Sequence, residues 1–264
     1  MDRTPSKWHV QKHSEIVLKA IAKDRRDKAF CDLEIVCGET RFQVHRVVVC
    51  SCSSIIRAAC LGPWKEGACG VYEIKDCSDS LVERMLDYIY TSNYDELSSK
   101  GPAEEGQEPS QSVAKVGPAP QVMLHVKMME LGDMYLVDGL VQLAWKRFMK
   151  LLKSETTTNI LVDIIPEVYT LESNSANGIR NSVVGFMRER LAQLPLAADV
   201  DGPLGNVTRD VPDFTRDLLK SYVDAPIPGH CGSCGNDKTV PLAPLQSRCL
   251  LCHKGGALGL GYKR

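Results

Sequence analysis

The sequence has no run of about 18 apolar residues, which is roughly the minimum length of a membrane-spanning helix. Its first ten residues are mainly polar and lack the apolar stretch of a secretory signal, so we expect a cytoplasmic or nuclear protein. The formal net charge is only −1, which gives no bulk attraction to nucleic acid or to a membrane. Internal repeats that would indicate a solenoid are also missing. These absences favour a soluble protein with locally defined partners.

Signatures of catalysis are missing as well. The glycines at 255–261 follow no predicted strand, so they form neither a phosphate-binding loop nor a dinucleotide fingerprint. A cysteine hydrolase would need one thiol beside a histidine and an orienting group. His45 lies among Cys31, Cys50 and Cys52, but it is also readable as a structural histidine, and the scattered cysteines identify no single nucleophile. We therefore expect no enzymatic activity.

Hydrophobic periodicity predicts a succession of helices and strands in the first part of the chain. An amphipathic helix begins near Ser14, and alternating residues on either side of a Gly-Glu turn at 38–39 predict a β-hairpin. Two short helices between 46 and 61 follow, with serines placed to cap the second. A third strand at 70–74 then precedes a helix that starts from a capping box at Ser80.

After an interruption at 97–120, the rest of the chain up to residue 223 is predicted to be mainly helical. Residues 97–120 are rich in Ser, Gly, Pro, Glu and Gln, which predicts a disordered insertion within the first domain. Two consecutive helices then follow, separated near Gly139. Further helical patterns make up a predicted helical extension at 154–223; they span 159–171, 176–191 and 213–223.

The order of these elements, and the residues in them, resemble the BTB/POZ family. Residues 31–35 (CDLEI) and 41–49 (RFQVHRVVV) are similar to its acidic strand start followed by an aromatic residue and a His entering a helix. Three further stretches resemble later sequence blocks of the family, particularly as seen in fungal members: 64–66 (WKE), 82–91 (VERMLDYIYT) and 128–135 (MMELGDMY). The resemblance covers roughly half the chain. The insertion and several cysteines at usual Leu or Ala positions depart from the family pattern.

The resemblance implies an α+β domain at residues 14–153, with a short three-stranded sheet and helices, in a protein that binds other proteins. Family members commonly form homodimers through the first helix and neighbouring strand, here residues 14–22 and the region near Cys31. In members that recruit a cullin ubiquitin-ligase scaffold, a hydrophobic-x-Glu element follows the third helix, and Trp64 and Glu66 occupy the matching place. An exposed Trp can anchor in a partner pocket. The alternative is a Trp that packs locally beside a solvated Glu.

Two close cysteine pairs near the end of the chain have the spacing of metal ligands. They give C-x2-C, a 14-residue gap and a second C-x2-C, which is close to the spacing of tetrahedral zinc sites. The predicted ligands are Cys231, Cys234, Cys249 and Cys252. His230 or His253 could replace one thiolate, and free thiols in a disordered tail are the alternative. A structural zinc ion would give a small zinc-ribbon-like module at 226–256, with a hairpin or loop between the pairs.

The whole sequence therefore favours a dimeric adaptor that binds other proteins, with a cullin scaffold as one candidate partner. A transcriptional regulator that uses the zinc module for nucleic acid or partner binding is the alternative. Residues 226–264 hold five basic side chains and one acidic side chain, and Tyr262 is their single aromatic residue. Four thiolates on Zn²⁺ would lower this charge by about two. Nucleic acid is therefore the less favoured partner.

Overall fold

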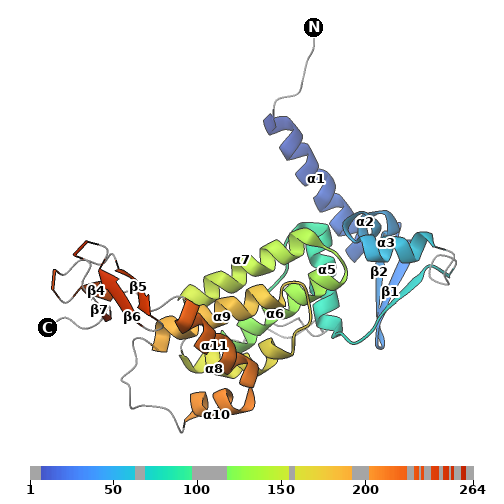
Figure 1. Ribbon diagram of the computed structural model, residues 1–264. Coiled ribbons are helices and arrows are strands. Elements are labelled where there is room, and N and C mark those ends of the chain that lie inside the picture. Colours follow the sequence, from blue (N-terminus) through green and yellow to red (C-terminus); the bar gives the residue numbers. More distant parts are fainter. Residues whose placement is uncertain are drawn as a thin grey trace, which may run out of the picture. The chain divides into compact units, whose positions relative to one another are not determined.

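The computed structural model describes residues 7–62, 69–96, 118–154, 158–191 and 202–224. In the tail it describes 229–231, 233–234, 239–243, 246–249, 251–252 and 257–259. The chain divides into two compact units, Met1–Lys150 and Leu151–Arg264 (Figure 1).

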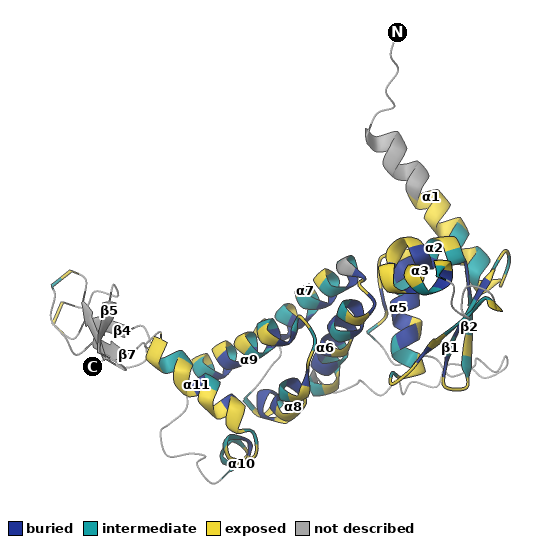
Figure 2. Ribbon diagram, turned by 45° about the vertical axis from the view of Figure 1, so that its right-hand side comes forward, coloured by how far each residue is buried: buried dark blue, intermediate teal, exposed yellow. Residues whose placement is uncertain are grey.

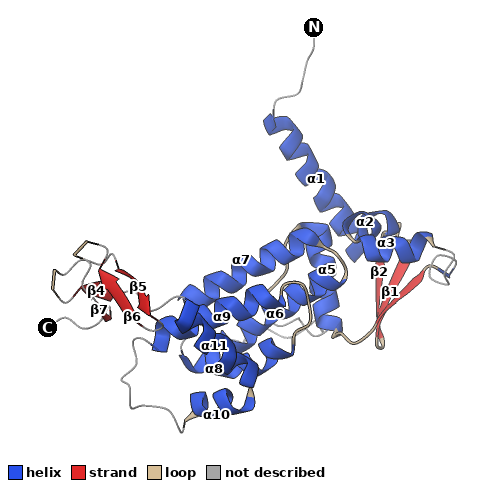
Figure 3. Ribbon diagram, viewed as in Figure 1, coloured by secondary structure: helices blue, strands red, loops and turns tan. Residues whose placement is uncertain are grey.

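A three-stranded sheet in the order β2-β1-β3 forms one part of the first unit (Figure 3). β1 (Leu33–Cys37) and β2 (Thr40–Val44) are antiparallel, and β3 (Val71–Ile74) runs parallel to β1. Side chains on β1 alternate between buried and half-buried, as expected for a strand with one face on a core. Gly38, with φ of 57°, provides the left-handed turn between the first two strands. The predicted hairpin and third strand are therefore confirmed.

Six described helices belong wholly or mainly to the first unit. They are α1 (Lys7–Arg26), α2 (Arg46–Cys52), α3 (Ser54–Leu61), α5 (Asp79–Thr91), α6 (Pro118–Met134) and α7 (Asp138–Ser154). Ser53 ends α2 and caps α3, because its hydroxyl accepts a hydrogen bond from the Ile56 amide at 3.2 Å. The same hydroxyl donates to the Tyr135 carbonyl at 2.6 Å, which ties α3 to the end of α6. The predicted serine cap therefore also makes a long-range contact.

The start of α5 differs from the prediction. The helix begins at Asp79 with Ser78 at the N-cap position, so Ser80 already lies inside the first turn and the predicted capping box is wrong. In the described structure the Ser78 side chain makes no capping bond, and its hydroxyl lies 3.2 Å from that of Ser80. The Ser80 amide is instead bonded by the Asp79 carboxylate at 2.7 Å. An acidic side chain in the first turn also suits the helix dipole.

Helix α5 forms the centre of the first unit. It packs against α1, α2 and α6, and most of its apolar side chains are buried (Figure 2). Met85 and Leu86 are fully buried, as are Ile35 on the sheet and Ile56 on α3. The buried Arg84 is held by the backbone carbonyls of Ser80, at 2.9 Å, and Asp95, at 3.0 Å. Burial of this cation is tolerated because its donors are satisfied.

The second unit contains a helical part and a small β tail. Its further helices are α8 (Thr158–Thr170), α9 (Ala176–Leu191), α10 (Pro203–Asp210) and α11 (Pro212–Asp224). α8 and α9 pack together, and α11 packs on both, with Phe214 fully buried. The Tyr169 ring stands edge-on to Phe214 with centroids 5.8 Å apart. The predicted bounds of α8, α9 and α11 lie within two residues of the observed ones, whereas α10 was not predicted.

Four short strands follow in the tail. β4 (Gly229–Cys231) pairs antiparallel with β7 (Ala257–Gly259), and β5 (Thr239–Ala243) pairs antiparallel with β6 (Gln246–Cys249). The β5–β6 hairpin lies where a hairpin or loop was predicted between the two cysteine pairs. None of the helices in the described ranges is both long enough and apolar enough to cross a membrane.

His125 on α6 is a buried ionisable group of the first unit. Its Nδ1 lies 2.7 Å from the Tyr94 hydroxyl, and among the described residues no partner is available for its buried Nε2. Burial, helped by the nearby Arg147 cation, lowers the pKa of His125 to about 4. The Arg147 guanidinium also stacks 4.2 Å from the Tyr94 ring centroid. Protonation of His125 would therefore place an uncompensated charge inside this cluster.

We predict that His125 makes the fold sensitive to acid. The unfolded histidine titrates near 6.5, so the stability that it contributes is full above about pH 6.5 and is lost as the pH falls toward 4. The expected loss is about 2 kcal/mol at pH 5, from the difference between the two pKa values. Urea unfolding at pH 7 and pH 5 measures it. His125→Leu should show the smaller decrease, and equal decreases in both proteins would contradict the assignment.

Candidate protein-interaction surfaces

Helix α1 carries apolar side chains that no described part of its own unit covers. Every side chain from Glu15 to Ala20 is exposed, including Ile16 at 58%. Val17 and Leu18, at 40% and 47% exposure, lead toward Ile21 on one side of the helix and form the α1 apolar row. Figure 2 shows this stretch of the helix in the exposed colour, with burial beginning near Ala22. Most helices in proteins gain their stability mainly from packing of an apolar face. The α1 apolar row is therefore a surface suited to a partner.

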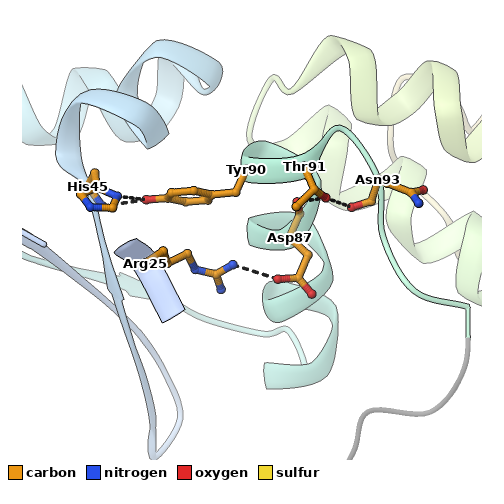
Figure 4. A network of polar contacts seen from close by, with 6 residues as sticks. All are labelled: Arg25, His45, Asp87, Tyr90, Thr91 and Asn93. Carbon is orange, nitrogen blue, oxygen red and sulfur yellow. Dashed lines mark hydrogen bonds and ion pairs between the residues drawn. The ribbon is translucent and has the colours of Figure 1, made fainter. Parts of the chain in front are cut away.

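The C-terminal end of α1 is fixed to α5. The Arg25 guanidinium lies 2.8 Å from the Asp87 carboxylate and 5.1 Å from the centroid of the Tyr90 ring. The Arg25 side chain is only 13% exposed, so its contacts are partly shielded from water. Figure 4 shows Arg25 reaching Asp87 beside Tyr90. These contacts set the direction in which the α1 apolar row leaves the domain.

His45 is a structural histidine held on both ring nitrogens. The Tyr90 hydroxyl accepts from the His45 backbone N–H at 2.8 Å and lies 2.9 Å from its Nδ1 (Figure 4). Nε2 lies 2.9 Å from the Ala29 carbonyl, which can only accept, so Nε2 carries the proton and Nδ1 accepts from Tyr90. The His45 residue is only 8% exposed, and both of its ring nitrogens have hydrogen-bond partners. These contacts fix the start of α2.

The Cys31–His45 pair lacks the arrangement of a catalytic nucleophile and base. The Cys31 sulfur is 4.0 Å from His45 Nε2, the nitrogen that already donates to Ala29. Burial raises the pKa of the Cys31 thiol, although the Arg25 cation acts in the opposite direction. A protonated thiol beside a nitrogen without a free lone pair cannot be deprotonated by it. This pair therefore supports no acyl-transfer chemistry.

A groove of about 1070 Å³ is also present in the first unit. Its walls include six basic and four acidic side chains, and several of the arginines bond neighbouring groups. Arg147, for example, bonds the Tyr94 carbonyl at 2.8 Å and lies 3.3 Å from the Glu96 carboxylate. Small-molecule sites are usually enclosed and mostly apolar. The polar lining instead resembles an ordinary solvated surface braced by ion pairs.

The predicted cullin-contact residues Trp64 and Glu66 lie outside the described residues. What is described is the helix before them, α3, which exposes Ile55 at 40% and Leu61 at 70%. The contact therefore stays a prediction, as does the alternative of local packing. Phe30 and Val47 are two further exposed apolar side chains of this unit, at 85% and 71%.

The predicted zinc ligands occupy equivalent backbone positions in the tail. Cys231 ends β4 and Cys249 ends β6, while Cys234 and Cys252 each lie in the turn that follows. Within the described part of the chain, no three His, Cys, Asp or Glu side chains gather as a metal site would require. The side chains of the two strand cysteines lie outside that part, and so does His253. Zinc binding therefore stays a prediction.

Sequence reasoning missed the residues that fix α1 and α2 to α5. Arg25 belongs to no motif identified in the sequence, and Tyr90 stands only within the family-like block at 82–91. The pairing of Arg25 with Asp87 spans 62 positions in the sequence, and that of His45 with Tyr90 spans 45. No local pattern in the chain specifies either contact.

The first unit combines a small mixed sheet, a central helix and a first helix with an exposed apolar row. Residues 22–103 match the family model described as the BTB/POZ domain, and the chain therefore contains a BTB/POZ domain at these positions. The helical region follows that domain.

Curated relatives match the same part of the chain. Kelch-like protein 3 of Mus musculus and of Homo sapiens are each 31% identical to it over 80 residues. This match covers 30% of this chain and only 14% of each relative. Among solved structures, the BTB domain of zebrafish PATZ1 is 18% identical, with a TM-score of 0.40 over 56% of this chain and 99% of that one. The BTB domain of human Gigaxonin is 16% identical, with a TM-score of 0.37 over 55% and 95%.

We predict that Tyr90→Phe destabilises the first unit by about 1–3 kcal/mol, because it leaves a buried amide and a ring nitrogen without their partner. Chemical denaturation measures the change. Tyr222→Phe is the control, since it keeps the ring that Arg188 contacts at 5.0 Å in the other unit. A Tyr90→Phe protein as stable as the wild type would show that water replaces the hydroxyl.

Proposed function

We propose that this protein is an adaptor that binds other proteins through a homodimeric BTB/POZ domain. The observation that carries the proposal is the uncovered α1 apolar row directly before the matched domain. The BTB/POZ family commonly dimerises through this helix, which agrees with the exposure pattern. The Cys31–His45 geometry gives no support to a catalytic alternative.

A second copy of the chain is the occupant that suits the α1 apolar row. In a two-fold dimer the same patch faces itself, so an apolar row can be buried without a separate complementary surface. Val17 and Leu18 lie three or four residues before Ile21, which continues the row on one side of the helix. Anchoring by Arg25 and Asp87 would hold the row in a fixed direction in both subunits. Pre-organised contacts lower the entropy that association costs.

We predict that Val17→Lys together with Leu18→Lys converts the dimer into a monomer. Lysine has a helix propensity similar to leucine and better than valine, so the substitution removes apolar surface without weakening the helix itself. Size-exclusion chromatography with light scattering measures the mass.

The matched control is Leu219→Lys, which places a lysine at a 60% exposed leucine of the second unit. This variant should remain a dimer. A monomeric wild type, or a dimer that survives both α1 substitutions, would overturn the dimer proposal.

A finer form of this proposal is that the adaptor recruits a cullin scaffold. Its support is the WKE sequence, which begins at the third residue after the end of α3, together with the exposed Ile55 and Leu61 on that helix. Buried aromatic anchors commonly dominate the energy of such interfaces, and a neighbouring carboxylate adds charge complementarity.

We predict that Trp64→Ala with Glu66→Ala lowers the affinity for a purified cullin at least tenfold, since loss of an anchor residue costs about 2 kcal/mol or more. Biolayer interferometry measures the affinity, and Lys65→Ala is the control within the same segment. Unchanged binding by the double variant would remove the motif from the account. A wild type that does not bind a cullin leaves the adaptor with other partners and refutes this finer form.

A further inference from the structure

The tail brings its two cysteine-bearing strands together. β4, which ends at Cys231, contacts β6, which ends at Cys249, although the two do not pair in one sheet. Each strand pairs instead with its own partner, Cys231 opposite Ala257 and Cys249 opposite Thr239. β6 also contacts β7, and β4 contacts β5, so the two separate two-stranded sheets lie against each other and bring the strands with the first cysteine of each pair into contact.

Both cysteine pairs have the same local structure. The first cysteine is the last residue of a strand, and the second lies in the turn after it, at Ser233–Cys234 and at Leu251–Cys252. A turn of this length lets two thiolates bind one side of a single ion, and two such turns supply the four ligands of a tetrahedral site. The repeated arrangement is independent of the sequence spacing, because the same spacing could equally lie within a helix or an extended loop.

The tail also needs a source of stability other than an apolar core. Residues 225–264 contain no Phe, Trp or Met, and Leu251 is 67% exposed. Isolated two-stranded sheets are marginal in water, and chain segments of about 40 residues usually need a metal or disulfides to fold. The strands here are only three to five residues long. A metal between the two sheets would hold both of them.

We propose that one zinc ion binds the four tail cysteines as a closed structural site: Cys231, Cys234, Cys249 and Cys252. Binding releases the four thiol protons, so Zn²⁺ with four thiolates carries a net charge of −2. A site closed by four protein ligands has no open position for water or substrate, which makes its role structural. The site is separate from the dimer surface proposed for α1 and does not depend on it.

The test is native mass spectrometry of the full-length protein purified without chelator, followed by the denatured mass. We expect one zinc per chain in the native spectrum and a fully reduced chain after denaturation. Cys231→Ser with Cys249→Ser should lose the metal. Cys52→Ser with Cys69→Ser is the matched control, because it removes two exposed cysteines from the first unit and should keep the zinc.

A second readout follows the fold of the tail. Trypsin should cut after Lys238 and Arg248 much faster once EDTA has removed the metal, and zinc should restore the protection. His230→Gln and His253→Gln should each retain the ion, and loss of zinc in either would overturn the four-cysteine ligand set. The proposal fails if the wild type is metal-free, if its denatured mass shows two disulfides, or if the tail double variant keeps its zinc.

Discussion

The Tyr90 hydroxyl is the contact on which the arrangement of the first unit depends. It accepts from the backbone of His45 and donates to its ring, and the Tyr90 ring lies beside the Arg25 guanidinium. One side chain of α5 therefore fixes both the entry into α2 and the end of α1. Since these groups are largely buried, each must keep its partner or lose the free energy of a desolvated polar group. The domain can accordingly present α1 in one direction.

That direction matters because the α1 apolar row has no cover within its own unit. A domain that holds an apolar helix rigidly outward has already lost part of the conformational entropy of association. The contacts that fix α1 to α5 are polar and largely buried, whereas the α1 apolar row, which would contact a partner, is exposed. His45 is likewise used for structure, because its ring has no lone pair free for chemistry and instead bonds the Ala29 backbone carbonyl. An adaptor role agrees with this use of polar groups.

Most elements could be predicted because their signals are local. Alternation at β1, the Gly38 turn and the helical periodicity of α5, α8 and α9 each involve residues close in sequence. The capping-box prediction at Ser80 was wrong because Ser78, Asp79 and Ser80 can all occupy an N-cap position. The local pattern does not show which of them lies just before the helix. The short α10 escaped prediction in a region rich in Pro, Gly and Asp.

The sequence by itself determined the α+β pattern, the BTB/POZ resemblance and the ligand spacing of the tail cysteines, since each depends on the order of residues along the chain. Tertiary structure alone decided that Arg25 meets Asp87, that His45 is held by Tyr90, and that β4 lies beside β6. It also left the α1 apolar row exposed, which periodicity cannot reveal, because an amphipathic helix reads the same whether its apolar side is covered or not. Contacts between distant residues arise from packing that no local pattern encodes.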